Sequence, residues 1–145
     1  MFQFHFLDIP DTWLDPARIR EIQEIFSDSV PFFQFGGVNI SLLPDDEIHR
    51  LNQQYRGKDA TTDVLSFHYY DVFEESHQDE IVAEIVMSES RILAQAEEHG
   101  HTPREEFETL LIHSLLHILG LDHETDSDFE DMWKYEKKIR SHMSL

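Results

Sequence analysis

HSLLHILGLDH, residues 113–123, carries three histidines, His113, His117 and His123, in a mostly apolar stretch. Residues four apart on an α-helix lie about 40° apart around the axis and about 6 Å apart along it, so His113 and His117 share one face. A third ligand must come from another direction, because tetrahedral coordination cannot be completed along a straight helix. Gly120 can end the helix in the left-handed conformation and swing His123 back toward the pair. The spacing predicts one metal site made by three histidines.

The helix that carries the first two histidines is expected over residues 104–119. Its start is predicted by an N-cap residue, a first-turn proline and a capping-box acid, which are Thr102, Pro103 and Glu105. From residue 110 onward the helix is apolar nearly all round, so we expect it to be buried. A buried polar group without a partner costs about 1 to 3 kcal/mol. This cost favours a shared metal ion over three unrelated core histidines.

The composition is that of one globular domain spanning residues 1–145, with 40% hydrophobic and 12% aromatic residues. There is no cysteine, so disulfides and thiolate ligands are excluded, and a metal has to be held by histidine, carboxylate or water. The N-terminal residues lack a basic region and a long apolar segment, and no run of about 18 apolar residues occurs. We expect a soluble, cytoplasmic protein with no membrane association.

The formal net charge of −19 argues against broad electrostatic attraction to nucleic acid or to an anionic membrane. A local basic site is still compatible with this charge. One basic cluster consists of Arg50, Arg56 and Lys58, and another lies within residues 134–140. We interpret the second cluster as an ordinary solvated face.

The hydrophobic periodicity predicts an α+β fold. Strands are expected at residues 2–6, 38–43, 64–70 and 81–87, and helices at 16–27, 45–55, 89–99, 104–119 and from within 125–128 onward. The order β, α, β, α, β, β, α, α, α indicates a mixed sheet of about four strands flanked by about five helices. The histidine spacing makes the helix at 104–119 a zincin-like metal helix. In the last helix, we expect an inward stripe made by Phe129, Met132, Trp133 and Ile139.

A site with three histidines and one open position is the arrangement that activates a bound water near neutral pH, and we favour it over a closed structural site. A closed site would need a fourth protein ligand, for which the candidates are Asp122, Glu124, His99, His101 and His68. The histidine spacing also matches certain zinc peptidases, in which a glutamate directly after the first histidine is the general base. Ser114 occupies that position here, and a hydroxyl cannot do that proton work at pH 7.

The stretch 113–123 resembles the H-G-x-L-H-x-x-G-x-D-H signature of the YbeY family, which are bacterial metal-dependent endoribonucleases implicated in ribosomal RNA maturation and ribosome quality control. LNQQYRGKDATTDVLSF, residues 51–67, is similar to the family's L-N-x-x-Y-R-x-x-D-x-P-T-D-V-L-S-F block. AEIVMS, residues 83–88, resembles its G-D-I-x-I-S segment before a helix. The resemblance spans roughly residues 40–140, and the two longer blocks in this order make it specific.

The resemblance implies that His113, His117 and His123 are the ligands of one zinc ion, with other divalent metals possible, and that Arg56 is the functional arginine. It implies a single-strand-specific endoribonuclease acting in 16S ribosomal RNA 3′-end maturation and ribosome quality control. The strong negative charge then suggests a docked substrate, such as RNA presented on a ribosomal particle whose associated proteins offer basic surface. Its fold, a small mixed sheet flanked by helices, is similar to the one that the pattern predicts. This chain departs from the family pattern at Thr61, His68, Ala83, Glu84 and Ser114, none of which is one of the three ligand histidines that the resemblance implies.

In the resulting mechanism Arg56 clamps a phosphate, a task that suits a planar guanidinium with five donors. The alternative interpretation is a surface arginine that pairs with Asp59 or Asp63. Glu84 and Asp122 are candidates for proton transfer, although Asp122 is better suited to orienting a ligand histidine.

Two other classes of function remain open at this point. The first is a zinc metallohydrolase with a different substrate, such as a peptidase. The second is a ribosome assembly factor in which the metal only holds the fold.

Overall fold

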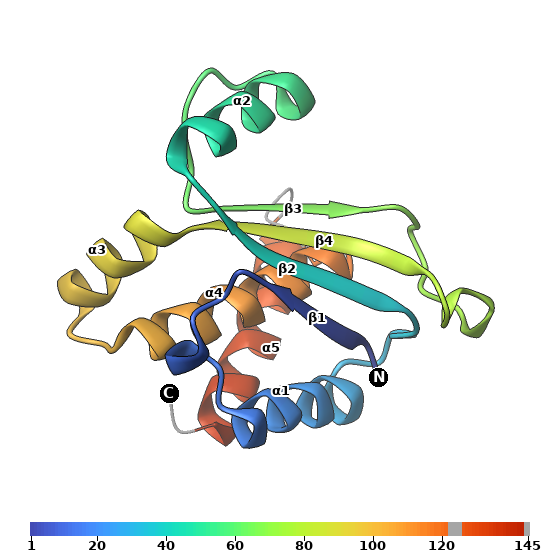
Figure 1. Cartoon of the computed structure of the whole chain (residues 1–145). Coiled ribbons are helices and arrows are strands. Elements are labelled where there is room, and N and C mark those ends of the chain that lie inside the picture. Colours follow the sequence, from blue (N-terminus) through green and yellow to red (C-terminus); the bar gives the residue numbers. More distant parts are fainter. Residues whose placement is uncertain (122–125, 144–145) are drawn as a thin grey trace.

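The computed structural model describes residues 1–121 and 126–143, with the backbone only for residues 126–129. Within these ranges the chain forms four strands, five α-helices and two short 3-10 helices (Figure 1). In chain order these are β1 (Gln3–Leu7), η1 (Asp11–Trp13), α1 (Pro16–Ser29), β2 (Gly37–Leu43), α2 (Asp45–Arg56), β3 (Val64–His68), η2 (Glu75–His77), β4 (Ile81–Ser88), α3 (Glu89–His99), α4 (Pro103–Ile118) and α5 (Asp126–His142). The order predicted for the strands and α-helices is confirmed, whereas η1 and η2 were not predicted.

The four strands form one mixed sheet in the order β1-β2-β4-β3. β1 pairs with β2 and β2 with β4 in parallel, while β3 pairs with β4 antiparallel. The parallel pair β1 and β2 is joined by a crossover through α1, and the antiparallel pair follows directly in sequence. The α+β class with a mixed four-stranded sheet is confirmed. In this order β3 lies at one edge of the sheet.

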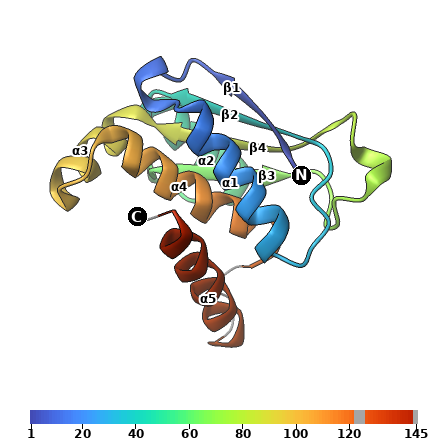
Figure 2. The same cartoon turned by 90° about the horizontal axis from the view of Figure 1, so that it is seen from below.

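The helices divide unequally between the two faces of the sheet. α1, α4 and α5 cover one face, and α2 lies on the other (Figures 1 and 2). The main core fills the first face, and its fully buried members include Ile22, Ile40, Ile85, Phe107 and Leu111. A much smaller cluster made by Ile48, Leu65 and Val86 joins α2 to the second face. The face a residue occupies therefore decides whether it can approach the histidines of α4.

The predicted caps are present at the ends of α3 and α4. The Ser88 hydroxyl accepts a hydrogen bond from the backbone N–H of Arg91 at the start of α3. Thr102 and Glu105 form a complete capping box at the start of α4. Gly120 follows α4 with φ of +88°, in the left-handed region predicted for the end of this helix. These local signals fix where the helix that carries His113 and His117 starts and stops.

The buried carboxylate of Glu108 links α4 to α1. Glu108 is fully buried, and its oxygens accept hydrogen bonds from Arg18 Nε of α1 at 2.8 Å and from Arg104 Nη1 at 2.9 Å. Arg18 Nη1 also donates to the carbonyl oxygen of Met143 at 3.4 Å. Because a buried charge needs a partner, this pairing restrains the position of α1 relative to α4.

The inward stripe predicted for α5 is wrong at one residue. Met132 and Ile139 are buried as expected, but the side chain of Trp133 is 55% exposed. Trp133 follows Met132 directly, so it is turned about 100° around the helix from the stripe. The Nζ atom of Lys137 lies 4.8 Å from the centre of the Trp133 ring, an arrangement typical of a cation–π contact. Phe129 has no described side chain.

No helix in residues 1–121 and 126–143 combines the length and the apolar character needed to cross a lipid bilayer.

Candidate metal centre

The histidine pair lies on the one strip of α4 that reaches the surface. Beyond Glu106, the only partly exposed side chains of this helix are Thr109, His113 and His117, which are spaced four residues apart. All its other residues from 106 to 118 are buried, as the apolar sequence predicts. The sheet and the core therefore hold the helix rigidly while the imidazoles face outward.

His113 and His117 point their Nε2 atoms toward each other. These atoms lie 3.0 Å apart, and the rings are nearly perpendicular, with an interplanar angle of 76°. Two nitrogens that bind one zinc ion tetrahedrally at about 2.05 Å are about 3.3 Å apart, so this pair fits a shared ion. His123 lies outside the described residues, together with Asp122 and Glu124. The structure thus brings together two of the three predicted ligands.

Glu136 of α5 lies behind His113. Its Oε1 atom is 3.5 Å from Nδ1 of His113, on the side of the ring away from His117. A carboxylate in this position holds a ligand imidazole in one orientation and increases its basicity. Sequence reasoning assigned this task to Asp122 and missed Glu136. The sequence did offer one signal for it: Glu136 follows Met132 by four residues, so the acid lies on the same side of the helix as the buried stripe of α5.

Arg56 is the last residue of α2, and its exposed side chain contacts β3. Its Nη2 atom donates to the carbonyl oxygen of Ser66 at 3.3 Å. Asp59 lies instead 2.6 Å from Nε2 of His49, and Asp63 accepts a hydrogen bond from Gln95. Among the described residues, the ion pair of Arg56 with Asp59 or Asp63 does not form. The α4 helix packs against the same strand, β3, from the other face of the sheet.

Glu84 belongs to the α2 face of the sheet. It lines a cavity of about 500 Å³ together with Tyr55, Phe67 and Tyr69. The hydrogen bond that the Tyr69 hydroxyl donates to Glu84 raises the pKa of Tyr69 to about 12. Because α4 packs on the opposite face, the sheet separates Glu84 from the histidine pair. This placement argues against Glu84 as the proton-transfer group of a reaction at that pair.

Ser114, which follows the first histidine, is completely buried. Its Oγ atom has no hydrogen-bond partner among the described residues. A hydroxyl in this position is held inside the core and cannot reach a substrate at the surface. Its small size is what the close packing around α4 requires.

A second group with metal-ligating chemistry lies where α3 leads into α4. His99, His101 and Glu106 each offer one ligand atom, and these atoms all lie within 4.8 Å of one another. Sequence reasoning named the two histidines only as possible fourth ligands of the first site, and it missed Glu106. The described residues thus contain a three-residue group that can hold a metal ion.

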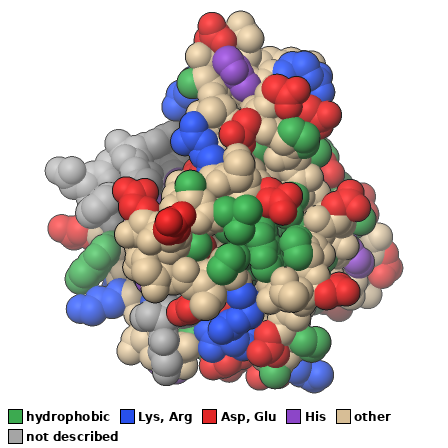
Figure 3. Space-filling model, turned by 60° about the vertical axis from the view of Figure 1, so that its left-hand side comes forward, with side chains coloured by type: hydrophobic (Ala, Val, Ile, Leu, Met, Phe, Trp, Pro, Cys, Tyr) green, Lys and Arg blue, Asp and Glu red, His purple; other side chains and the backbone are tan. Residues whose placement is uncertain are grey.

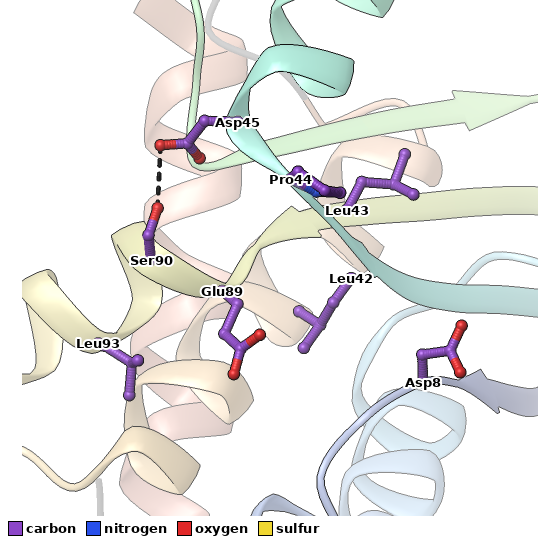
Figure 4. Close-up of a pocket in the computed structure, with 8 residues that line it drawn as sticks. All are labelled: Asp8, Leu42, Leu43, Pro44, Asp45, Glu89, Ser90 and Leu93. Atoms are coloured by element: carbon purple, nitrogen blue, oxygen red, sulfur yellow. Dashed lines mark hydrogen bonds between the residues drawn. The ribbon is translucent and has the colours of Figure 1, made fainter.

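A separate groove of about 500 Å³ lies at the junction of α2 and α3 (Figure 4). Asp45, the first residue of α2, accepts hydrogen bonds there from Ser88 and from Ser90, the latter at 2.9 Å. These hydrogen bonds, chiefly the one from Ser88, lower the pKa of Asp45 below its usual value. The face toward α3 shows hydrophobic side chains gathered at its centre with acidic ones around them (Figure 3). The contacts of Asp45 tie the starts of two helices together, so we interpret them as structural.

The chain is similar to known proteins along most of its length. The family model described as Endoribonuclease YbeY matches residues 14–144. A protein of Bacillus pumilus named Endoribonuclease YbeY is 34% identical over 84% of this chain and 81% of its own length. The protein of that name from Macrococcus caseolyticus is 39% identical over 100% of this chain and 97% of its own length.

One solved structure has a similar fold. The solution structure of TM1509 from Thermotoga maritima has a TM-score of 0.58 and 28% sequence identity, covering 99% of this chain and 92% of its own. The family match extends further toward the N-terminus than the roughly 40–140 expected from the motifs. The chain therefore belongs to the family described as Endoribonuclease YbeY.

Proposed function

We propose that this protein is a metal-dependent endoribonuclease that cuts single-stranded RNA and acts as a single domain. His113, His117 and His123 hold one zinc ion, and Arg56 binds a phosphate of the substrate. The observation that carries the proposal is the pair of Nε2 atoms 3.0 Å apart on the exposed strip of a rigid helix, in a chain of this family.

The residues around the pair prepare it for a cation. When bound, the metal ion supplies Lewis acidity that lowers the pKa of water and neutralises charge on phosphoryl oxygens. Glu136, whose Oε1 lies 3.5 Å from Nδ1 of His113, favours the tautomer with the proton on Nδ1, which would leave the Nε2 lone pair for a metal ion. The buried residues that flank the pair exclude water from one side of the site.

Arg56 and its neighbours provide contacts for RNA around the edge of the sheet. Tyr55 and Tyr69 are 63% and 57% exposed, and both line the cavity at the C-terminal end of α2. Exposed aromatic rings are surfaces on which unstacked bases stack. β3 is an edge strand and α4 packs against it, so in this proposal a flexible single strand bends around the edge from Arg56 on one face to the histidines on the other.

The physiological substrate in this proposal is ribosomal RNA, with a role in 16S 3′-end maturation and ribosome quality control in the cytoplasm. The net charge of −19 repels free RNA, and on the face toward α3 basic side chains lie scattered among acidic ones (Figure 3). A ribosomal particle, with proteins that offer basic surface, would overcome this repulsion by presenting the RNA at the site.

Two alternatives are weaker. A peptidase needs a general base beside the first histidine, and the residue there, Ser114, is buried. An assembly factor with a purely structural metal would need a fourth protein ligand to close the site, whereas the family signature supplies three histidines. A peptide cleavage assay run beside the RNA assay tests the peptidase alternative, which predicts cleavage of the peptide and not of the RNA. The second predicts that a chelator unfolds the protein instead of only stopping cleavage.

The decisive experiment compares metal content and cleavage of a defined single-stranded RNA in three variants. His117→Ala should lose the zinc ion of this site and cleavage together. Arg56→Ala should keep its zinc and lose about tenfold to a hundredfold in cleavage rate, the worth of a charge-assisted hydrogen bond. Arg50→Ala, on the same helix, is the matched control and should cleave normally. Full zinc in His117→Ala would contradict the ligand assignment, and an unchanged rate in Arg56→Ala would dispose of the phosphate contact.

A further inference from the structure

Three polar side chains converge at the corner between α3 and α4, apart from the histidine pair. His99 ends α3, His101 lies in the connection, and Glu106 is in the first turns of α4. The Nδ1 atoms of His99 and His101 lie 3.3 Å and 3.5 Å from the same oxygen, Oε2 of Glu106. Glu106 precedes His113 by seven residues, so about 10.5 Å of helix axis separates this cluster from the pair.

The negative charge of Glu106 is buried and needs a positive charge beside it. Its side chain is only 4% exposed, and among the described residues no lysine or arginine lies within ion-pair distance of it. A buried carboxylate is costly unless a positive charge compensates it, and an imidazole supplies that charge only when protonated. In addition, Nδ1 of His101 is buried and makes no hydrogen bond in the described part of the chain, although it faces the carboxylate. One positive ion among the three groups would satisfy all of them.

We propose that His99, His101 and Glu106 form a second divalent-metal site. Two nitrogens and one oxygen are a donor set that suits zinc, cobalt or nickel, whereas magnesium and calcium prefer oxygen ligands alone. Ligand atoms arranged tetrahedrally around an ion at about 2.1 Å lie about 3.4 Å apart, which matches both distances to Glu106 Oε2.

This site would join two helices through one ion. Its ligands come from the end of α3, from the connection and from the start of α4, so a bound ion cross-links α3 to the helix that carries His113 and His117. The two sites share no ligand, and the inference therefore does not rest on the proposed function.

The test is a zinc titration by calorimetry of the full chain after removal of metal with a chelator. The variant His99→Ala/His101→Ala should bind one zinc ion per chain fewer than the unmodified protein. The matched control is His49→Ala/His77→Ala, which also removes two histidines, each beside a carboxylate, at 2.6 Å from Asp59 and 2.8 Å from Glu80. It should keep the full number of zinc ions. Glu106→Gln, which keeps the shape of the side chain, should weaken binding at this site.

Equal zinc stoichiometry in the unmodified protein and in His99→Ala/His101→Ala would overturn the proposal. His117→Ala, titrated in parallel, distinguishes the two sites. If only His99→Ala/His101→Ala binds less zinc, the second site is supported and the ligand assignment of the first site is not. Should the double variant fail to fold, anomalous scattering at the zinc edge from crystals of the unmodified protein decides the question. A peak between the three side chains supports the site, and its absence at saturating zinc refutes it.

Discussion

Replacing Glu136 by glutamine removes the negative charge behind His113 and keeps the shape of the side chain. By Coulomb's law, a carboxylate 3.5 Å from Nδ1 attracts one unit of positive charge on the ring by about 1.2 kcal/mol at the dielectric constant of water. Loss of a carboxylate behind a ligand histidine generally weakens metal binding by about 10- to 100-fold. Because the site is partly exposed and glutamine still accepts a hydrogen bond, we expect the lower limit, about a tenfold rise in the zinc dissociation constant.

The assay is competition for zinc between the protein and a chromophoric chelator at fixed pH. Glu130→Gln is the matched control, because it removes an exposed acid from the same helix and should leave the affinity unchanged. The melting temperature of the metal-free protein should be similar in both variants, which separates a change in the site from a change in the fold. A Glu136→Gln variant that binds zinc as tightly as Glu130→Gln would refute the role of Glu136.

Two further predictions concern stability. Arg18→Met removes one of the two partners of buried Glu108. It should lower the free energy of unfolding by about 2 kcal/mol, which is about half the cost of breaking a buried ion pair, and lower Tm by about 6 °C. Arg20→Met removes an exposed pair and should cost less than about 0.5 kcal/mol, and equal losses in urea unfolding would contradict the difference. Because the pKa of Asp45 is lowered on folding, its contribution is present above its unfolded value of 3.8 and is lost as the pH falls through the folded value. Ser90→Ala should therefore be less stable than the unmodified protein at pH 6, and this gap should narrow in unfolding curves recorded below pH 3.8.

The order of the elements could be predicted because each signal for it is local. The capping box at Thr102, the cap at Ser88 and the glycine at 120 act on the backbone within a few residues, and the structure contains all three. The spacing of His113 and His117 is equally local, since the geometry of one helix sets it. Such features do not depend on how distant parts of the chain meet.

The acids that pair with histidines and arginines in the interior could not be predicted, for the opposite reason. Glu106, Glu108 and Glu136 find their partners across helices, and Arg18 lies 90 residues from Glu108 in the sequence. The sequence shows thirty acids and does not indicate which of them is buried. Glu84 illustrates the same limit, because only the sheet register and the position of α2 place it away from α4.

The unequal division of helices between the two faces has a consequence for how the molecule opens. In the described part of the chain, the buried apolar contacts of α2 are those of the small cluster of Ile48, Leu65 and Val86, to which Asp45 adds hydrogen bonds at the start of the helix, whereas α4 is held by the main core. Segments with few apolar contacts detach at a lower free-energy cost than the rest of a domain. The amides of α2 should therefore exchange with deuterium through a local opening, faster than those of α4. Arg56, the last residue of α2, would move with this helix, while His113 and His117 keep their positions on α4.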